Sequence, residues 1–119
     1  MPSLDVDNQS SRVHSAALNE NEFFLDDIAM GAIGLVQLNG ERVAVHHASD
    51  GFYATDDRCP HTGWPLSDGG ELVGHEVTCA MHGWCFNITD GSVVRGMKSL
   101  KIQTYRVIID GDIGRVELV

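Results

Sequence analysis

The chain has 119 residues, 43% of them hydrophobic, which suffices for one globular domain with a modest core and not for two. Seventeen acidic against eight basic residues give a net charge of −9, which argues against nucleic acid or an anionic membrane as a partner. No segment reaches the apolar length of a membrane span, and the first twenty residues lack the apolar core of a signal peptide, so we expect a cytoplasmic protein.

The first half of the chain predicts a tail followed by strands. Residues 1–19 are polar and poorly periodic, which predicts a flexible N-terminal tail ahead of a domain over 20–119. Short apolar runs predict strands at 22–25, 32–38, 42–49 and 52–55. Asn39-Gly40 predicts a tight hairpin between the second and third of these, because both residue types tolerate positive φ.

The second half predicts further strands at 76–80, 84–88, 100–110 and 114–119. Turn residues separate them, and no helical stripe appears. This pattern is typical of an all-β fold, an antiparallel sandwich or barrel. Loops at about 57–68 and 79–87 are expected to form a small inserted subdomain, at about 57–88, on the strand scaffold.

Two short motifs in these loops carry candidate metal ligands. Cys59 and His61 form C-x-H, and Cys79 and His82 form C-x-x-H. Gly-Trp follows in both loops, at 63–64 and 83–84, which indicates two loops of similar structure that form one site together. A structural zinc site is the main alternative, because zinc accepts two Cys and two His, but zinc sites usually use C-x-x-C or H-x3–5-H pairs. Mixed and unequal pairs favour a binuclear iron–sulfur centre instead.

The segments CPHTGWPLSDGG and VTCAMHGWCFNITDG resemble the cluster-binding segments of Rieske ferredoxins, and the resemblance covers about residues 20–119. It implies a Rieske iron–sulfur domain with one [2Fe–2S] cluster, whose ligands would be Cys59, His61, Cys79 and His82. Two thiolates would bind one iron and two imidazoles the other.

The resemblance also implies an electron carrier and not an enzyme by itself. Such a protein takes one electron from a flavin reductase and delivers it to a terminal oxygenase, here an aromatic-ring dioxygenase or a related hydroxylase. The acidic surface would dock transiently on a basic patch of these partners. The chain has no G-x-G-x-x-G loop for a nucleotide cofactor and no room for the mononuclear iron domain of a terminal oxygenase.

Two other functions stay open. One is the small Rieske subunit of an assimilatory nitrite reductase, bound permanently to a large subunit. The other comes from a different class, a structural zinc interaction module with two Cys and two His ligands.

The residues that follow the second motif indicate the redox range. Respiratory and photosynthetic Rieske proteins carry a Ser and a Tyr, two and four residues after the second ligand His, that hydrogen-bond to the cluster. Trp84 and Phe86 stand here and offer no hydroxyl, so we expect a potential near the bottom of the Rieske range of about −150 to +300 mV. Trp64 and Met81 replace the disulfide that joins the loops in those proteins.

Other polar candidates are weaker. His46 and His47 are adjacent on a predicted strand and should face opposite sides, as ordinary strand residues. Cys85 is expected to be a small buried apolar residue. Trp64 and Trp84 either dock a partner or shield the cluster, and residues 95–98 are expected to cover it.

Overall fold

Strands, together with the turns and loops that join them, make up nearly all of residues 18–119, the part of the chain that the computed structural model describes. The expected tail over 1–19 lies almost entirely outside the described residues. The elements are β1 (Glu22–Phe24), the 3-10 helix η2 (Leu25–Asp27), β2 (Ile33–Leu38), β3 (Glu41–Ala48), β4 (Gly51–Asp56), β5 (Glu71–Val73), β6 (Glu76–Thr78), β7 (Cys85–Asn87), β8 (Val93–Arg95), β9 (Thr104–Asp110) and β10 (Ile113–Leu118). Among these residues no helix is long and apolar enough to span a membrane.

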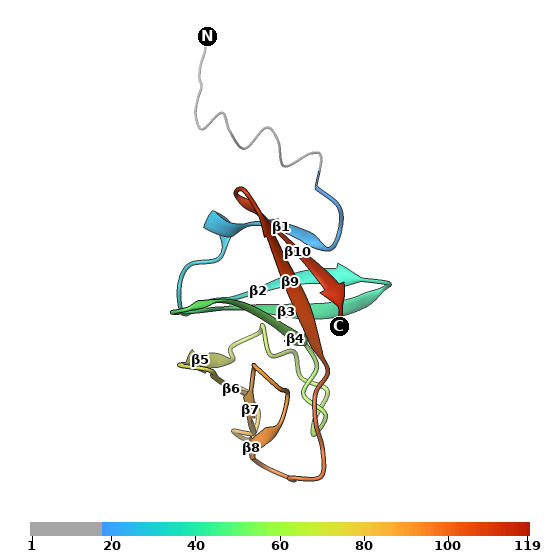
Figure 1. The fold of residues 1–119 in the computed structure, drawn as a ribbon. Helices are drawn as coiled ribbons and strands as arrows, with labels where there is room; N and C mark the ends of the chain where they lie inside the picture. Colours follow the sequence, from blue (N-terminus) through green and yellow to red (C-terminus); the bar gives the residue numbers. More distant parts are fainter. Residues whose placement is uncertain (1–17) are drawn as a thin grey trace.

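The strands form two antiparallel sheets, which confirms the predicted fold class (Figure 1). A six-stranded sheet has the order β1-β10-β9-β4-β3-β2, and a four-stranded sheet has the order β5-β6-β7-β8. The smaller sheet is inserted between β4 and β9. It extends to Arg95, past residue 88 where we expected the insertion to end, because β8 pairs with β7.

The predicted turns position most of these strands. Asn39 and Gly40 have φ of 54° and 83° and join β2 to β3 in register, as the hairpin signal required. The last long strand is shorter than expected, because β9 begins at residue 104. The residues before it cross from one sheet to the other instead: Lys101 bridges to Ser92, and the buried Ile102 donates its N–H to the Gly91 carbonyl.

The sheets enclose two apolar cores. Alternation along β3 divides its side chains, so that Val43 and Val45 pack in the core of the six-stranded sheet and Ala48 packs in the other core. That second core also contains Cys59, Cys79 and buried residues of the inserted sheet, among them Phe86. The cysteine ends of both predicted ligand motifs are therefore part of the hydrophobic interior.

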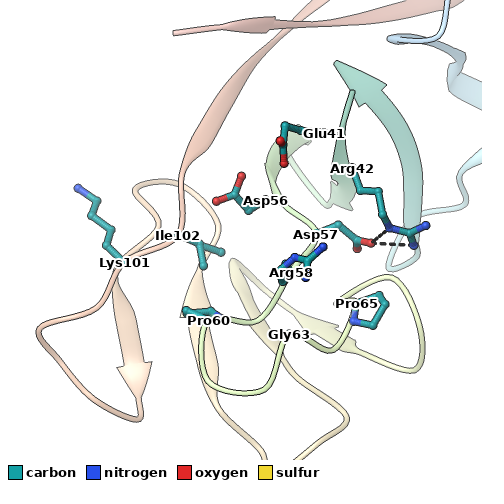
Figure 2. Close-up of a pocket in the computed structure, with 10 residues that line it drawn as sticks. All are labelled: Glu41, Arg42, Asp56, Asp57, Arg58, Pro60, Gly63, Pro65, Lys101 and Ile102. Carbon is teal, nitrogen blue, oxygen red and sulfur yellow. Dashed lines mark hydrogen bonds and ion pairs between the residues drawn. The ribbon is translucent and has the colours of Figure 1, made fainter. Parts of the chain in front are cut away.

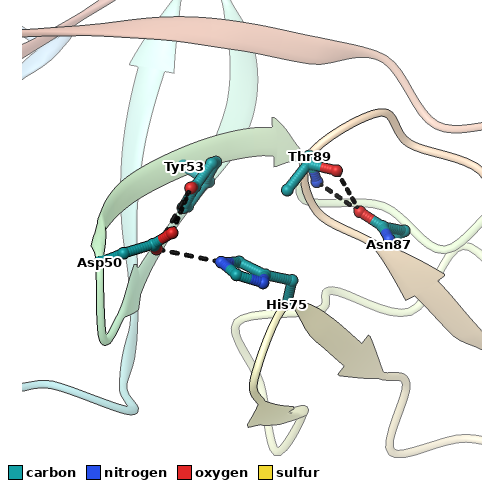
Figure 3. Close-up of polar contacts among 5 residues, drawn as sticks. All are labelled: Asp50, Tyr53, His75, Asn87 and Thr89. Carbon is teal, nitrogen blue, oxygen red and sulfur yellow. Dashed lines mark hydrogen bonds and ion pairs between the residues drawn. The ribbon is translucent and has the colours of Figure 1, made fainter.

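A polar contact also ties the two sheets together (Figure 3). The Asp50 carboxylate, in the β3–β4 turn, accepts the Tyr53 hydroxyl at 3.1 Å and lies 3.0 Å from His75 Nε2 in the β5–β6 turn. Nearby, Thr89 donates its N–H to the Asn87 side chain and closes the turn after β7. The scaffold thus holds the inserted sheet at two places, an apolar core and a surface polar contact.

Candidate metal centre

The two ligand motifs lie in loops that close in the same way. The Cys59 N–H donates to the Trp64 carbonyl at 3.0 Å, and the Cys79 N–H donates to the Trp84 carbonyl at 2.7 Å. Each loop therefore spans six residues, from a Cys to a Trp. The repeated Gly-Trp in the sequence reflects this shared backbone geometry.

Glycine is required near the end of each loop. Gly63 and Gly83 have φ of 77° and 73°, in the left-handed region that other residues rarely adopt. His82 also has positive φ, 68°, whereas His61 does not. The extra residue before His82 therefore places that histidine in the left-handed turn itself, which accounts for the unequal C-x-H and C-x-x-H spacing.

The structure brings the four predicted ligands together as two pairs at different depths. Cys59 and Cys79 are 0% and 1% exposed, and their thiols are hydrogen-bonded to each other. His61 and His82 are exposed, with ring centroids 5.3 Å apart. A buried sulfur pair beneath an exposed imidazole pair fits a centre with two metal ions.

The same geometry disfavours the zinc alternative. A structural zinc ion needs four ligands around one point. In residues 18–119, no group of three or more His, Cys, Asp or Glu side chains surrounds a single ion position. The ligands lie instead as a buried cysteine pair and an exposed histidine pair, the arrangement that a binuclear iron–sulfur cluster requires.

The Cys79 sulfur lies in an environment of opposing effects. Burial raises the pKa of the Cys79 thiol, and its hydrogen bond with Cys59 raises it further. The backbone of Met81 and the hydroxyl of Thr62 form hydrogen bonds with the sulfur that lower this pKa. Since such bonds favour the thiolate, they also favour a sulfur that binds metal.

Thr62 is a site residue that the sequence analysis missed. Its hydroxyl bonds to Cys79 of the opposite loop, while its oxygen accepts the Trp64 N–H at 3.1 Å. The sequence signal was a residue with a hydroxyl directly after His61. We considered hydroxyl groups only in the residues after His82, and Thr62 was therefore overlooked.

Trp84 supports the first loop from the second. Its ring stacks on the His61 imidazole, with centroids 4.4 Å apart and planes within 4°. A Cβ placed on Gly96 would come within 2.5 Å of the Trp84 ring, so residues 95–98 pack closely on the site, as expected of a cover. Trp64 has a different role, because its indole N–H donates to the Asp68 carbonyl and its side chain is 37% exposed.

The first loop is anchored to the six-stranded sheet through Asp57, which is 2% exposed. Its carboxylate accepts Arg42 Nη2 at 3.0 Å and the Ser67 N–H at 2.8 Å. A groove of about 450 Å³ lies beside this anchor. Its lining includes Glu41, Asp56, Arg58, Pro60, Lys101 and Ile102 (Figure 2). Leu66 is fully buried in the core next to both cysteines.

His46, His47 and the third cysteine do not join the site. His46 is fully buried and bonds to Thr55 Oγ1 at 2.9 Å, whereas His47 bonds to the Ile28 carbonyl at 2.7 Å. Cys85 is 2% exposed and, like the other two cysteines, forms no disulfide. These placements match what the sequence predicted for all three residues.

Comparison with known proteins identifies the kind of domain. The family described as "Rieske [2Fe-2S] domain" matches residues 23–106. The chain is 35% identical, over 72% of its length and 82% of the relative, to the ferredoxin component of the naphthalene 1,2-dioxygenase/salicylate 5-hydroxylase systems of Ralstonia sp. It is 31% identical, over 73% of its length and 80% of the relative, to the biphenyl dioxygenase ferredoxin subunit of Pseudomonas sp. strain KKS102.

A solved structure with the same fold comes from a complex of reduced oxygenase and oxidized ferredoxin in carbazole 1,9a-dioxygenase. The match has a TM-score of 0.74 and 28% identity, and it covers 83% of this chain and 94% of the other.

Proposed function

The chain belongs to the Rieske [2Fe–2S] family, and on that basis we propose that it is a ferredoxin that carries single electrons from a flavin reductase to a terminal oxygenase. Its relatives are named as ferredoxin components of dioxygenase systems, so it is an electron-transfer component and not an enzyme by itself. The cofactor of this family is a [2Fe–2S] cluster, which takes up and releases one electron.

Four residues are the proposed ligands. Cys59 and Cys79 would hold the inner iron, and His61 and His82 the outer one. The single observation that supports this best is their division by depth, with a buried pair of sulfurs and an exposed pair of imidazoles. The exposed pair also gives a partner the shortest route to the centre.

The surroundings of these ligands favour a low reduction potential. Phe86 is fully buried in the same core as both cysteines, and the Trp84 ring stacks on the His61 imidazole. Neither ring offers a hydroxyl that would stabilise the reduced state. Thr62 supplies one hydroxyl at Cys79, so the potential should lie above that of an otherwise identical site without it.

The partners are proposed from the relatives. These relatives are ferredoxin components of naphthalene 1,2-dioxygenase/salicylate 5-hydroxylase systems and of a biphenyl dioxygenase, and the solved ferredoxin is in complex with its oxygenase. We therefore propose an aromatic-ring dioxygenase or a related hydroxylase as the electron acceptor. A cytoplasmic location stays a prediction, supported by three cysteines without a disulfide.

Voltammetry of the purified protein tests this function. We expect one reversible one-electron wave at the low end of the Rieske range, and reduction of cytochrome c by the chemically reduced protein. A Cys79→Ser variant, which removes one proposed sulfur ligand, should lose both signals. Consumption of NADH by the wild type without a reductase, or the absence of any reversible wave, would contradict a carrier function.

A further inference from the structure

Charge is distributed unevenly between the two parts of this fold. Of the fifteen carboxylates in residues 18–119, ten lie in residues 18–56 and 105–119, where only three cations occur. Six of these ten carboxylates lie in or next to β1, η2 and the β9–β10 turn, at the end of the molecule remote from β8 (Figure 1): Glu20, Glu22, Asp26, Asp27, Asp110 and Asp112. The remaining four cations are all exposed and lie in residues 57–104: Arg58, Arg95, Lys98 and Lys101.

Two of these cations lie directly beside the second ligand loop. Arg95 pairs with Cys85 at the end of β8, and its Nε donates to the carbonyl of Gly83, the residue after His82. Lys98 follows three residues later, and its ammonium donates hydrogen bonds to the carbonyls of Val93 and Val94. The segment that joins Arg95 and Lys98 packs on Trp84, which stacks on His61. Both cations are therefore near the exposed imidazoles.

The other two cations lie beside the first ligand loop (Figure 2). Arg58 immediately precedes Cys59, and its Nη1 is 3.8 Å from the position of a Cβ on Gly63. Lys101 lines the same groove as Arg58 and Pro60. None of the four cations forms an ion pair with another residue of 18–119.

The carboxylates of this segment leave the face largely unneutralised. Asp57 is paired with Arg42, and Glu76 pairs with Asn87 at the end of the small sheet opposite the loops. Glu71 lies at the loop end, but on the β5 edge. Three strand spacings, about 14 Å, separate that edge from β8, which exceeds the screening length of about 8 Å at physiological salt.

Four more carboxylates need to be counted. Glu41 and Asp56 line the same groove as Arg58 and Lys101 (Figure 2). Asp68 is exposed and follows the first loop towards β5, on the side away from β8. Asp90 accepts hydrogen bonds from Ser92 and lies near enough to Lys101 to interact with its charge. Arg58 and Lys101 are therefore partly compensated, and Arg95 and Lys98 carry most of the local positive charge.

Apolar side chains accompany these cations. Met81, between Cys79 and His82, is 38% exposed, and Met97, between Arg95 and Lys98, is 57% exposed. Methionine adapts its shape to a partner surface at little cost. A polar, charged rim around an apolar centre is the usual composition of a transient interface.

We propose that His61, His82, Met81 and Met97, together with Arg58, Arg95, Lys98 and Lys101, form a basic docking face for a redox protein that presents carboxylates around an apolar centre. This inference rests on the proposed function. It reverses the sequence-based expectation that the acidic surface makes the contact. The acidic end of the molecule instead turns away from a carboxylate-bearing partner, and the two ends together orient the approach.

Small redox ions of opposite charge test whether positive or negative charge surrounds the exposed histidines, where electrons would leave the cluster. The probes are ferricyanide, a trivalent anion, and hexaammineruthenium(III), a trivalent cation. Each accepts one electron from the chemically reduced holoprotein, and stopped-flow absorbance records the rate as ionic strength is raised. We expect the ferricyanide rate to fall with salt and the ruthenium rate to rise, although the net charge of −9 alone predicts the opposite.

Two exposed cations provide a matched pair of variants. Lys98→Glu lies on the proposed face, and Arg106→Glu changes the net charge equally but lies on β9 of the other sheet. At low ionic strength Lys98→Glu should slow ferricyanide about three- to tenfold and speed the ruthenium complex, while Arg106→Glu should change either rate less than twofold.

The outcomes separate the inference from the function. A reducible cluster whose reaction with ferricyanide accelerates with salt, or equal effects of Lys98→Glu and Arg106→Glu, would overturn the basic docking face alone. A protein that holds no reducible cluster would overturn the proposed function and this inference with it.

Discussion

The His61 imidazole and the Trp84 indole lie face to face, 4.4 Å apart and within 4° of parallel, although they belong to different ligand loops. The stack joins the loops at their exposed end. In respiratory and photosynthetic Rieske proteins, a disulfide joins the two loops instead. At the buried end, the sulfurs of Cys59 and Cys79 are in contact. The two loops are thus held together at both depths without a covalent bond between them.

Replacing Trp84 should loosen the centre. An aromatic stack contributes about 0.5–1.5 kcal/mol beyond area burial, so Trp84→Ala should speed the loss of iron to a chelator at least two- to tenfold. Trp64→Ala is the matched control, because Trp64 occupies the equivalent loop position but is more exposed and contacts no histidine ring among the described residues. Equal rates of iron loss in the two variants would show that the stack does not matter.

The hydroxyl of Thr62 should raise the reduction potential. Since it donates to the Cys79 sulfur, it stabilises the more negative, reduced state. Thr62→Val should lower the midpoint by some tens of millivolts, because a difference of about 1 kcal/mol between redox states corresponds to about 40 mV for one electron. Thr62→Ser keeps the hydroxyl and should keep the potential. Voltammetry that gives Val and Ser variants the same midpoint would remove Thr62 from the tuning of this site.

Gly96 should tolerate no side chain. It has φ of 136°, and a Cβ would come within 2.5 Å of Trp84. Gly96→Ala should cost about 1–3 kcal/mol in free energy of unfolding, because it overpacks this contact and strains the backbone. Gly74→Ala is the control, with φ of 60° and nothing within 4 Å. Urea unfolding monitored by near-ultraviolet circular dichroism should show the larger loss for Gly96→Ala, and the reverse order would be inconsistent with close packing there.

Acid should weaken the fold through His46. Burial lowers the pKa of His46 to about 4 from 6.5, and in the described structure its Nδ1 has no hydrogen-bond partner. The unfolded chain therefore binds a proton between these pH values while the folded chain does not. Stability should fall by about 3 kcal/mol as pH drops from 6.5 to 4, and this contribution should level off below pH 4.

The variant His46→Gln isolates this effect. Subtracting its free energy of unfolding from that of the wild type at each pH removes the contributions that both proteins share. The difference should decline only between pH 6.5 and 4. His75→Gln, which removes a partly exposed histidine, serves as the control. A difference that is flat across this range would mean that His46 binds protons equally in the folded and unfolded states, which would contradict the lowered pKa.

Local signals in the sequence predicted much of the scaffold. Asn39-Gly40 fixed one hairpin through residue chemistry alone, and alternating apolar residues gave the long strands. The three-residue strands β5 and β8 were not predicted, because each contains a run of only two apolar residues. The strand predicted at 100–110 was extended too far towards the N-terminus, because residues 100–103 alternate like a strand but cross between the sheets.

The site was predictable where its chemistry is local, and not where it depends on contacts between loops. Spacing alone singled out Cys59, His61, Cys79 and His82. The contacts of Thr62 with Cys79 and of Trp84 with His61 join residues about twenty positions apart, and no pattern in one sequence encodes them. Net charge alone does not say where charges lie, and in this structure four exposed cations lie beside the ligand loops.

Pulsed electron paramagnetic resonance of the reduced protein, prepared with ¹⁵N-labelled histidine, tests the proposed ligand set most directly. Two strongly coupled histidine nitrogens are predicted, one from His61 and one from His82, and the replacement of either histidine should remove one coupling. A paramagnetic cluster without nitrogen coupling, or one that keeps both couplings after either histidine is replaced, would contradict the assignment.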